Sequence, residues 1–174
     1  MTRPHIVLLP VALAALLALG ACGSDIVVGS ANLHIKGNDV EITPRGHAPA
    51  VVRPDGGLLI DGAAVEVPGE ARERLVAYSA AVRAMLQHGI ETGKAGAAVA
   101  ASAVSEVTKG LASGDTSQIG AKVEEKADAV RAKALSICDD LAAARREQEA
   151  VAAAVAAFRP YAVIEAGEGE RCRH

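Results

Sequence analysis

The chain has 174 residues and a formal net charge of −3, from 18 basic and 21 acidic side chains. A near-neutral chain with two Tyr, one Phe and no Trp is a poor candidate for a nucleic-acid binder, since it offers neither a basic surface nor rings for stacking. With 51% hydrophobic residues, including 38 alanines, it is also too apolar for a disordered polar tail, and its length predicts about one domain.

Residues 1–21 are typical of a bacterial export signal. Arg3 supplies a positive charge, and the 14 residues from Ile6 to Leu19 are uncharged, which is too short for a stable membrane-spanning helix. The next segment, Leu19-Gly20-Ala21-Cys22, resembles the lipobox of bacterial lipoproteins. The resemblance implies cleavage before Cys22 and lipidation of this cysteine, and three acyl chains anchor a protein stably. The alternative is an ordinary secretory signal with a chance cysteine.

Residue Gly23 follows the lipidated position, where the Gram-negative sorting rule reads an Asp as retention in the inner membrane. By that resemblance, the protein is expected on the outer membrane, with its domain facing the periplasm. Residues 22–31 are interpreted as a lipidated tether, with a short strand at Ile26–Val28 as an option.

Residues 32–67 alternate between apolar and polar side chains, and turn residues separate the short runs. The turns are expected at Gly37-Asn38, Pro54–Gly57 and Asp61-Gly62. This pattern predicts an antiparallel β-meander of three to five strands. Such a small sheet is marginal alone and needs another element against its apolar face.

Residues 68–158 change to a helical period. A first apolar stripe begins at Leu75 and Tyr78, and His88-Gly89 is predicted to weaken or kink this helix. Small residues then recur every fourth position, and an apolar stripe continues beyond them. The small-residue ladder is Gly89, Gly93, Ala97 and Ala101, and the stripe is Val104, Val107 and Leu111. The ladder predicts close helix packing inside the domain. The alternative is a glycine zipper in or on a membrane, which the charges of Glu91 and Lys94 disfavour.

The second half of this region predicts one helix of about 40 residues, or two collinear helices. Apolar residues from Ile119 to Phe158 step by four and three, with Lys126 and Gln148 as polar exceptions, and Arg159-Pro160 is expected to end the helix. The predicted fold is therefore α+β, with a small N-terminal antiparallel β-meander packed on a long antiparallel helical hairpin or bundle.

Residues 159–174 form a Gly-rich tail that contains the third cysteine of the chain, Cys172. Once Cys22 is lipidated, Cys138 and Cys172 remain in a compartment that favours oxidation. The tail is long enough to return along the helix from Phe158, so we predict a Cys138–Cys172 disulfide. The alternative is a buried helical thiol at Cys138 and a free terminal thiol at Cys172.

Several residues of the sheet region together resemble the YggN-like family of bacterial envelope proteins of unknown function. They are Ile35–Asn38, Val40–Pro44, Pro54–Gly57, Ile60–Gly62 and Tyr78, with a weaker similarity from Cys138 to Phe158. The resemblance covers roughly 45 residues, rests mainly on turn chemistry, and implies a secreted α+β domain. It brings no catalytic residue or cofactor.

Catalytic and metal-binding motifs are not found. Gly89–Ala95 lacks one spacer and the hydroxyl of a nucleotide-binding loop. The mature histidines are scattered, Asp139-Asp140 point about 100° apart on a helix, and the acidic tail is expected to be solvated. The histidines are His34, His47, His88 and His174, and the acidic tail residues are Glu165, Glu168 and Glu170.

Two functions remain open from the sequence. The first is a structural or partner-binding role for a lipid-anchored periplasmic domain, with an unidentified envelope protein as partner, no cofactor and no enzymatic activity. The second is an enzyme or small-ligand carrier with a site between the sheet and the helices. It rests on His34 and His47, which flank the sheet near the carboxylates of Asp39 and Glu41.

Overall fold

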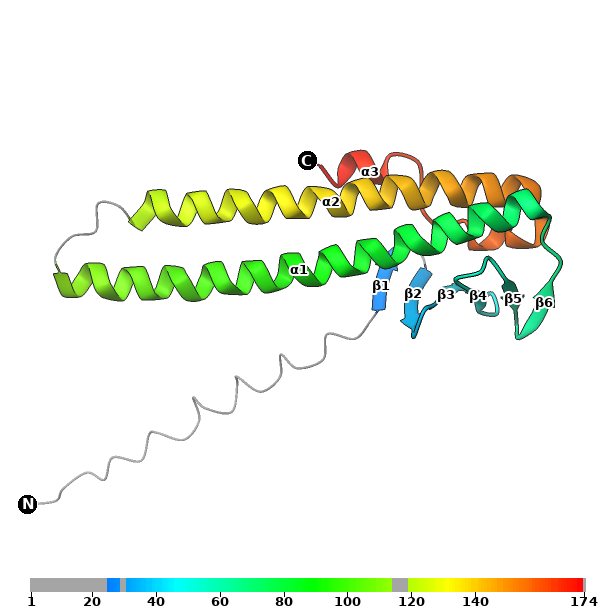
Figure 1. Cartoon of the computed structure of the whole chain (residues 1–174), viewed down its shortest axis with the longest axis horizontal. Helices are drawn as coiled ribbons and strands as arrows, with labels where there is room; N and C mark the ends of the chain where they lie inside the picture. The colour runs from blue at the N-terminus through cyan, green and yellow to red at the C-terminus, as the bar shows by residue number, and fades with distance from the viewer. Residues whose placement is uncertain (1–24, 29–30, 114–118, 174) are drawn as a thin grey trace, which may run out of the picture.

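The computed structural model describes residues 25–28, 31–113 and 119–173, which form an α+β fold. An N-terminal sheet lies against one end of a long helical hairpin, and the other end of the hairpin extends past the sheet (Figure 1). This arrangement confirms the predicted class, a small antiparallel meander on antiparallel helices.

The sheet is a six-stranded antiparallel meander in which each strand pairs with the next one along the chain. Its inner face carries side chains that are almost completely buried, and polar residues alternate with them on β2 and β3. The first strand lies inside residues 22–31, the segment that the sequence predicts as a tether with an optional short strand at Ile26–Val28. The strands are β1 (Asp25–Val28), β2 (Ala31–Lys36), β3 (Asp39–Pro44), β4 (Ala50–Val52), β5 (Leu58–Ile60) and β6 (Ala63–Val65).

Two of the predicted turns adopt the backbone that short hairpins require. Gly37, with φ of 65°, occupies the first turn position between β2 and β3, which is the glycine position of a type II′ turn. Asp61 and Gly62 have φ of 51° and 75° between β5 and β6, as a type I′ turn needs. These two-residue turns therefore fix the register of the strands that they join, and this register agrees with the alternation of apolar and polar residues.

Two long helices follow the sheet, α1 (Gly69–Ser113) and α2 (Ile119–Ala154). The expected weakening at His88-Gly89 is not observed, because α1 continues through both residues without interruption. The helix α2 ends before the predicted stop. Val155 adopts an extended backbone, and Pro160 lies inside the following 3-10 helix η2 (Ala156–Tyr161). A short helix, α3 (Glu168–Arg171), ends the described chain.

All three aromatic residues of the chain meet where the sheet, α1 and η2 come together. The rings of Tyr78 and Phe158 pack edge to face, with centroids 6.0 Å apart, and the Tyr161 ring lies 6.1 Å from Phe158. Tyr161 donates a hydrogen bond to the carbonyl of Ala48 at 2.9 Å. The Tyr78 hydroxyl is buried without a hydrogen-bond partner among the described residues, and this burial raises the pKa of Tyr78.

The C-terminal tail folds back along α2 instead of extending into solvent. The side-chain amide of Gln148 is buried, donates to the Ile164 carbonyl at 2.6 Å and accepts from the Ile164 amide at 3.1 Å. Gln148, one of the two polar exceptions in the heptad pattern, therefore binds the returning tail. Further along, Cys138 and Cys172 are joined in a disulfide, with their Cα atoms 5.6 Å apart.

Candidate interaction surface

The half of the hairpin beyond the sheet is held together by small side chains and by polar pairs that cross between the helices. Ala95, Val99 and Ser102 of α1 are partly buried; Ala95 and Val99 line a groove shared with α2, and Ser102 accepts a hydrogen bond from Lys126 of α2. The His88 imidazole contacts the Asp140 carboxylate at 2.6 Å, and Lys122 approaches Glu106 at 3.6 Å. These contacts fix which side of α1 faces its neighbour.

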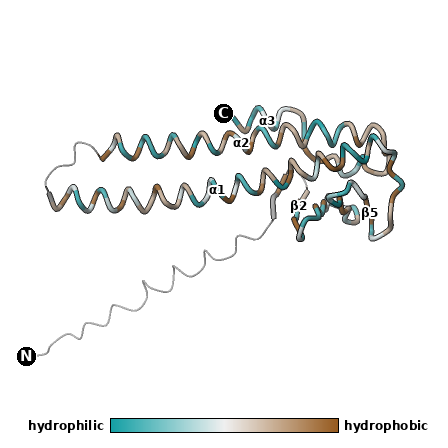
Figure 2. Tube along the Cα trace, in the orientation of Figure 1, coloured by the Kyte–Doolittle hydropathy of each residue, from teal (hydrophilic) through white to brown (hydrophobic). Residues whose placement is uncertain are grey.

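The opposite side of α1 carries a row of apolar and small residues that no described part of the chain covers. The row steps by three and four residues over Ile90, Gly93, Ala97, Ala100, Val104, Val107 and Leu111, which we call the distal face, and all seven residues are exposed. Val104 and Leu111 leave 69% and 74% of their surface accessible. Hydropathy colouring shows hydrophobic residues continuing along this half of α1 (Figure 2). A contiguous apolar row of this kind marks an interaction site more often than a scattered exposed leucine does.

The distal face corrects the expectation of close packing along the small-residue ladder. Gly93 and Ala97 are exposed, and a Cβ built on Gly89 or Gly93 meets nothing within 4 Å. The prediction was wrong because α1 has two apolar sides in this region. The side with Ala95 and Val99 packs on α2, and the side with the ladder does not.

The distal face is the continuation of the side of α1 on which the sheet packs. In the first half of α1, Leu75, Tyr78, Val82 and Met85 are buried in the common core with the strands. The same helical row then passes Leu86, which is half-buried, and becomes exposed from Ile90 onward. The sheet therefore covers only one end of a longer apolar row (Figure 1).

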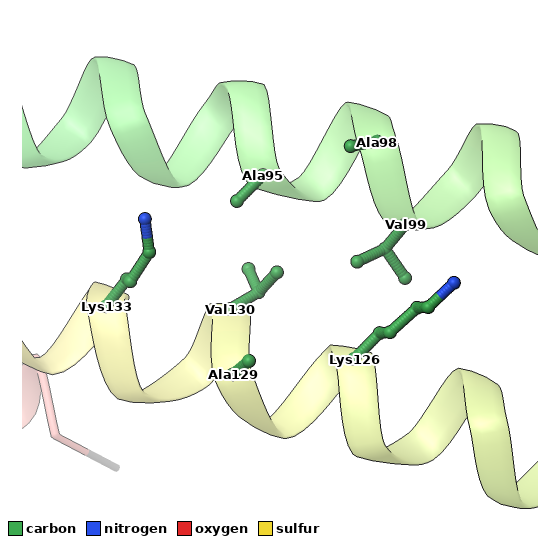
Figure 3. Close-up of a pocket in the computed structure, with 7 residues that line it drawn as sticks. All are labelled: Ala95, Ala98, Val99, Lys126, Ala129, Val130 and Lys133. Atoms are coloured by element: carbon green, nitrogen blue, oxygen red, sulfur yellow. The ribbon is translucent and has the colours of Figure 1, made fainter.

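A shallow groove lies between the two helices in this region (Figure 3). It encloses about 290 Å³, and two lysines of α2 stand at its edges. The Lys126 ammonium donates to the Ser102 hydroxyl across the groove. The lining is mainly alanine and valine, and it contains no nucleophile or acid–base pair. The lining residues are Ala95, Ala98, Val99, Lys126, Ala129, Val130 and Lys133.

The other candidate residues are dispersed over the fold. His34 is the register partner of Glu41 on neighbouring strands, whereas the His47 ring lies beside the Tyr161 ring, with the two centroids 6.4 Å apart. Asp139 binds Arg173 and Asp140 binds His88, so the two carboxylates serve separate contacts. Within the described residues, no group of three or more His, Cys, Asp or Glu side chains could hold a metal ion.

The acidic tail residues contribute to local structure. A carboxylate oxygen of Glu168 accepts a hydrogen bond from the Glu165 amide at 3.1 Å, which steadies the turn before α3. Glu165 and Glu170 are exposed. The predicted lipidation site Cys22, the predicted signal segment 1–21 and His174 lie outside the described residues.

No helix in residues 25–28, 31–113 and 119–173 is long and apolar enough to cross a membrane. Comparison with protein-family models, with characterised proteins and with solved structures finds no match to this chain. The lipobox and the resemblance to the YggN-like family therefore stay predictions from the sequence.

Proposed function

We propose that the protein is a lipid-anchored component of the bacterial cell envelope that binds a protein partner through the distal face of α1. Cys22 is the proposed lipidation site, and the outer membrane is the proposed location, with the domain in the periplasm. The observation that carries the binding role is the uncovered apolar row from Ile90 to Leu111. It lies on a helix that is already stabilised by α2, so the surface is available without unfolding the domain.

The composition of the distal face suits a helical partner. Its residues follow the three-and-four spacing by which one helix packs on another, and Gly93, Ala97 and Ala100 let a second backbone approach closely. The large side chains Val104, Val107 and Leu111 supply the apolar area that such a contact buries.

The ligand-carrier or enzyme alternative has less support. It requires a site between the sheet and the helices, but Leu33, Tyr78 and Phe158 fill that space and are each fully buried. His34 pairs with Glu41 in the sheet, and His47 lies against Tyr161. These positions offer no converging set of polar groups.

The anchor is tested by the Cys22→Ala variant of the full chain. We expect it to lose incorporation of labelled fatty acid and to move from the membrane fraction to the soluble periplasmic fraction. A variant that stays with the outer membrane after a salt wash would show that another feature holds the protein there.

The surface is tested by placing a photo-crosslinking amino acid at Val104 in the full chain in intact cells. The matched control carries it at Ala132, which is exposed on α2. We expect protein adducts from position 104 and few from position 132. Equal labelling at both positions would remove the distal face as the binding surface.

A further inference from the structure

We propose that the cavity between α2 and the C-terminal tail binds a phosphate group, either as inorganic phosphate or as a phosphate monoester. This site lies apart from the distal face, so the proposal goes beyond the proposed partner binding and does not rest on it. Three observations carry it: three guanidinium groups line one cavity, one of them has a buried N–H without an acceptor, and a disulfide joins the two walls.

The cavity lies where the returning tail packs on α2. The short helix α3 lies against α2, whereas the sheet packs on α1 (Figure 1). The cavity encloses about 360 Å³, within the range of about 300–1,000 Å³ that is usual for small-ligand sites. Its walls include Ala142, Arg145 and Arg146 of α2 and Gly169, Glu170 and Arg173 of the tail.

The lining of this cavity is positively charged, although the chain as a whole is negative. Three arginines face the single carboxylate of Glu170, whereas the whole chain has a net charge of −3. A concave site lined mainly by one sign of charge raises the local concentration of the opposite ion. The ligand that suits this cavity is therefore an anion.

The ion pairs that these arginines already form leave most of their donors unused. A guanidinium group has five N–H donors. Arg145 donates from Nη2 to Glu149, and this acceptor is 54% exposed against 31% for the arginine. Arg173 donates from Nη2 to Asp139, with exposures of 51% for the arginine and 66% for the acceptor. Ion pairs as exposed as these contribute little stability, so a ligand competes with them easily.

Two of the arginines have groups for which the described residues supply no acceptor. The Nε–H of Arg145 is buried and makes no hydrogen bond in the described part of the chain. The Arg146 side chain is exposed, and it forms no ion pair or hydrogen bond with the described residues. A buried donor without an acceptor costs stability, and an anion in the cavity would supply one.

The number and arrangement of the donors favour phosphate over a carboxylate. The two oxygens of a carboxylate suit the fork of a single arginine. A phosphate monoester has three terminal oxygens, and each of them can accept from a different guanidinium group. Here Arg145 and Arg146 reach the cavity from α2, and Arg173 reaches it from the tail. A phosphate group fills only part of the cavity, which leaves room for a small organic substituent.

The disulfide makes the tail a wall of the site. Arg173 directly follows Cys172, which is bonded to Cys138 of α2, and the two Cα atoms lie 5.6 Å apart. Gly169 also packs closely on α2, since a Cβ built on it would lie 3.3 Å from the Cβ of Ala142. Without the bond, the end of the tail can leave α2 and take the Arg173 guanidinium with it. The affinity for phosphate should therefore depend on the disulfide.

A phosphate titration of the full-chain protein, purified in a non-ionic detergent, tests the proposal. The arginine Nε–H signals are followed by nuclear magnetic resonance at constant ionic strength. Inorganic phosphate should shift the signals of Arg145 and Arg146 along a saturable curve in the millimolar range. It should not move the signal of Arg45, an exposed arginine between β3 and β4. Acetate should require about ten-fold higher concentrations. A lack of saturable shifts at tens of millimolar phosphate, or equal affinity for acetate, would overturn the proposal.

Variants separate this site from a general attraction of anions to positive charge. Arg146→Gln should weaken phosphate binding about ten-fold and melt like the parent, because the side chain has no partner among the described residues. Arg45→Gln removes the same charge elsewhere and should leave the affinity unchanged. Equal losses in these two variants would overturn the proposal.

Two further variants test the tail. Cys172→Ala keeps every charge but releases the tail, so it should also weaken binding about ten-fold. Glu170→Gln should tighten binding several-fold, because it removes the one carboxylate of the lining. Parental affinity in Cys172→Ala, or weaker binding in Glu170→Gln, would overturn the assignment of the tail as a wall of the site.

Two soluble probes distinguish a free phosphate compound from a lipid headgroup. Glycerol 3-phosphate is a monoester with three terminal oxygens, and glycerophosphoglycerol is the phosphodiester headgroup of phosphatidylglycerol, with two. We expect the monoester to bind at least as tightly as inorganic phosphate, and the diester about ten-fold more weakly. Tighter binding of the diester would overturn the monoester assignment and identify a lipid headgroup as the source. No partner protein is present in these titrations, so their failure and the failure of crosslinking at Val104 are independent results.

Discussion

The disulfide between Cys138 and Cys172 should account for a large part of the stability of this domain. The two residues are separated by 34 positions, and closing a loop of this length stabilises a chain by about 4 kcal/mol in the chain-entropy model. Part of this lost stability is offset in the reduced protein, because the tail after Ile164 can then detach and gain conformational freedom. Gln148 still holds the tail at Ile164. We therefore expect reduction to lower the free energy of unfolding by about 2–4 kcal/mol.

The measurement is urea unfolding of the purified domain lacking Cys22, with and without reductant, after a count of free thiols in the unreduced protein. A loss of 2–4 kcal/mol corresponds to a fall in melting temperature of roughly 4–16 °C for a domain of this size. Cys172→Ala is the matched variant, because Cys172 is exposed whereas Cys138 is buried, so the change removes the bond and little packing. This variant should unfold like the reduced protein and should not respond to reductant.

Two results would refute this reasoning. Two free thiols per chain in the unreduced protein would show that the bond does not form. Zero free thiols, together with a melting temperature that reductant leaves unchanged after the bond is broken, would show that the disulfide does not stabilise the domain by restricting the unfolded chain, as the entropy model requires.

Three further substitutions test the core and the turns, each by urea unfolding of the same domain. Tyr78→Phe should leave stability unchanged or raise it by about 1 kcal/mol, since it removes a buried hydroxyl without a partner and keeps the ring contact with Phe158; a clear loss would mean that the hydroxyl is bonded. Gln148→Leu should cost about 2–4 kcal/mol, because the buried amide and carbonyl of Ile164 both lose their partner, and hydrogen exchange at the Ile164 amide should accelerate. Gly56→Ala should cost about 1–3 kcal/mol more than Gly46→Ala, since both glycines have positive φ but only at Gly56 would the Cβ lie 2.3 Å from the Arg72 carbonyl oxygen; equal losses would contradict the close approach.

The sequence alone determined the local elements of this protein. Alternation of apolar and polar residues, with Gly37 and Asp61-Gly62 at the turns, is sufficient to predict the meander, because strand period and hairpin turns are local properties. The helical period and the absence of Gly and Pro between Ala121 and Arg159 likewise predict the long α2. Chain length allows Cys172 to reach Cys138, but the reversal of the tail that joins them is seen only in the tertiary structure.

Other features depended on contacts between residues far apart in the sequence. The periodicity marks Gln148 as an exception, but only the returning backbone of Ile164 gives its amide two partners. The chain contains three aromatic residues, and only the packing of η2 against α1 shows that they form one cluster. The His88 side chain, beside the glycine that suggested a break, instead contacts Asp140 of α2 within a continuous helix.

The orientation of the second half of α1 is the clearest case of tertiary control. Two rows of small and apolar residues run along this helix, one through Gly93 and Ala97 and the other through Ala95 and Val99. Either row satisfies the helical period, so the sequence predicts a helix with an apolar side but not which side meets α2. In the structure the row with Ala95 and Val99 packs on α2. The sheet packs against Tyr78 and Val82, and cross-helix pairs such as Arg74 with Glu147 join α1 to α2, so these contacts set the orientation of α1. The sequence therefore determined that this half of α1 is helical and apolar, and the tertiary structure decided that the row from Ile90 to Leu111 is exposed.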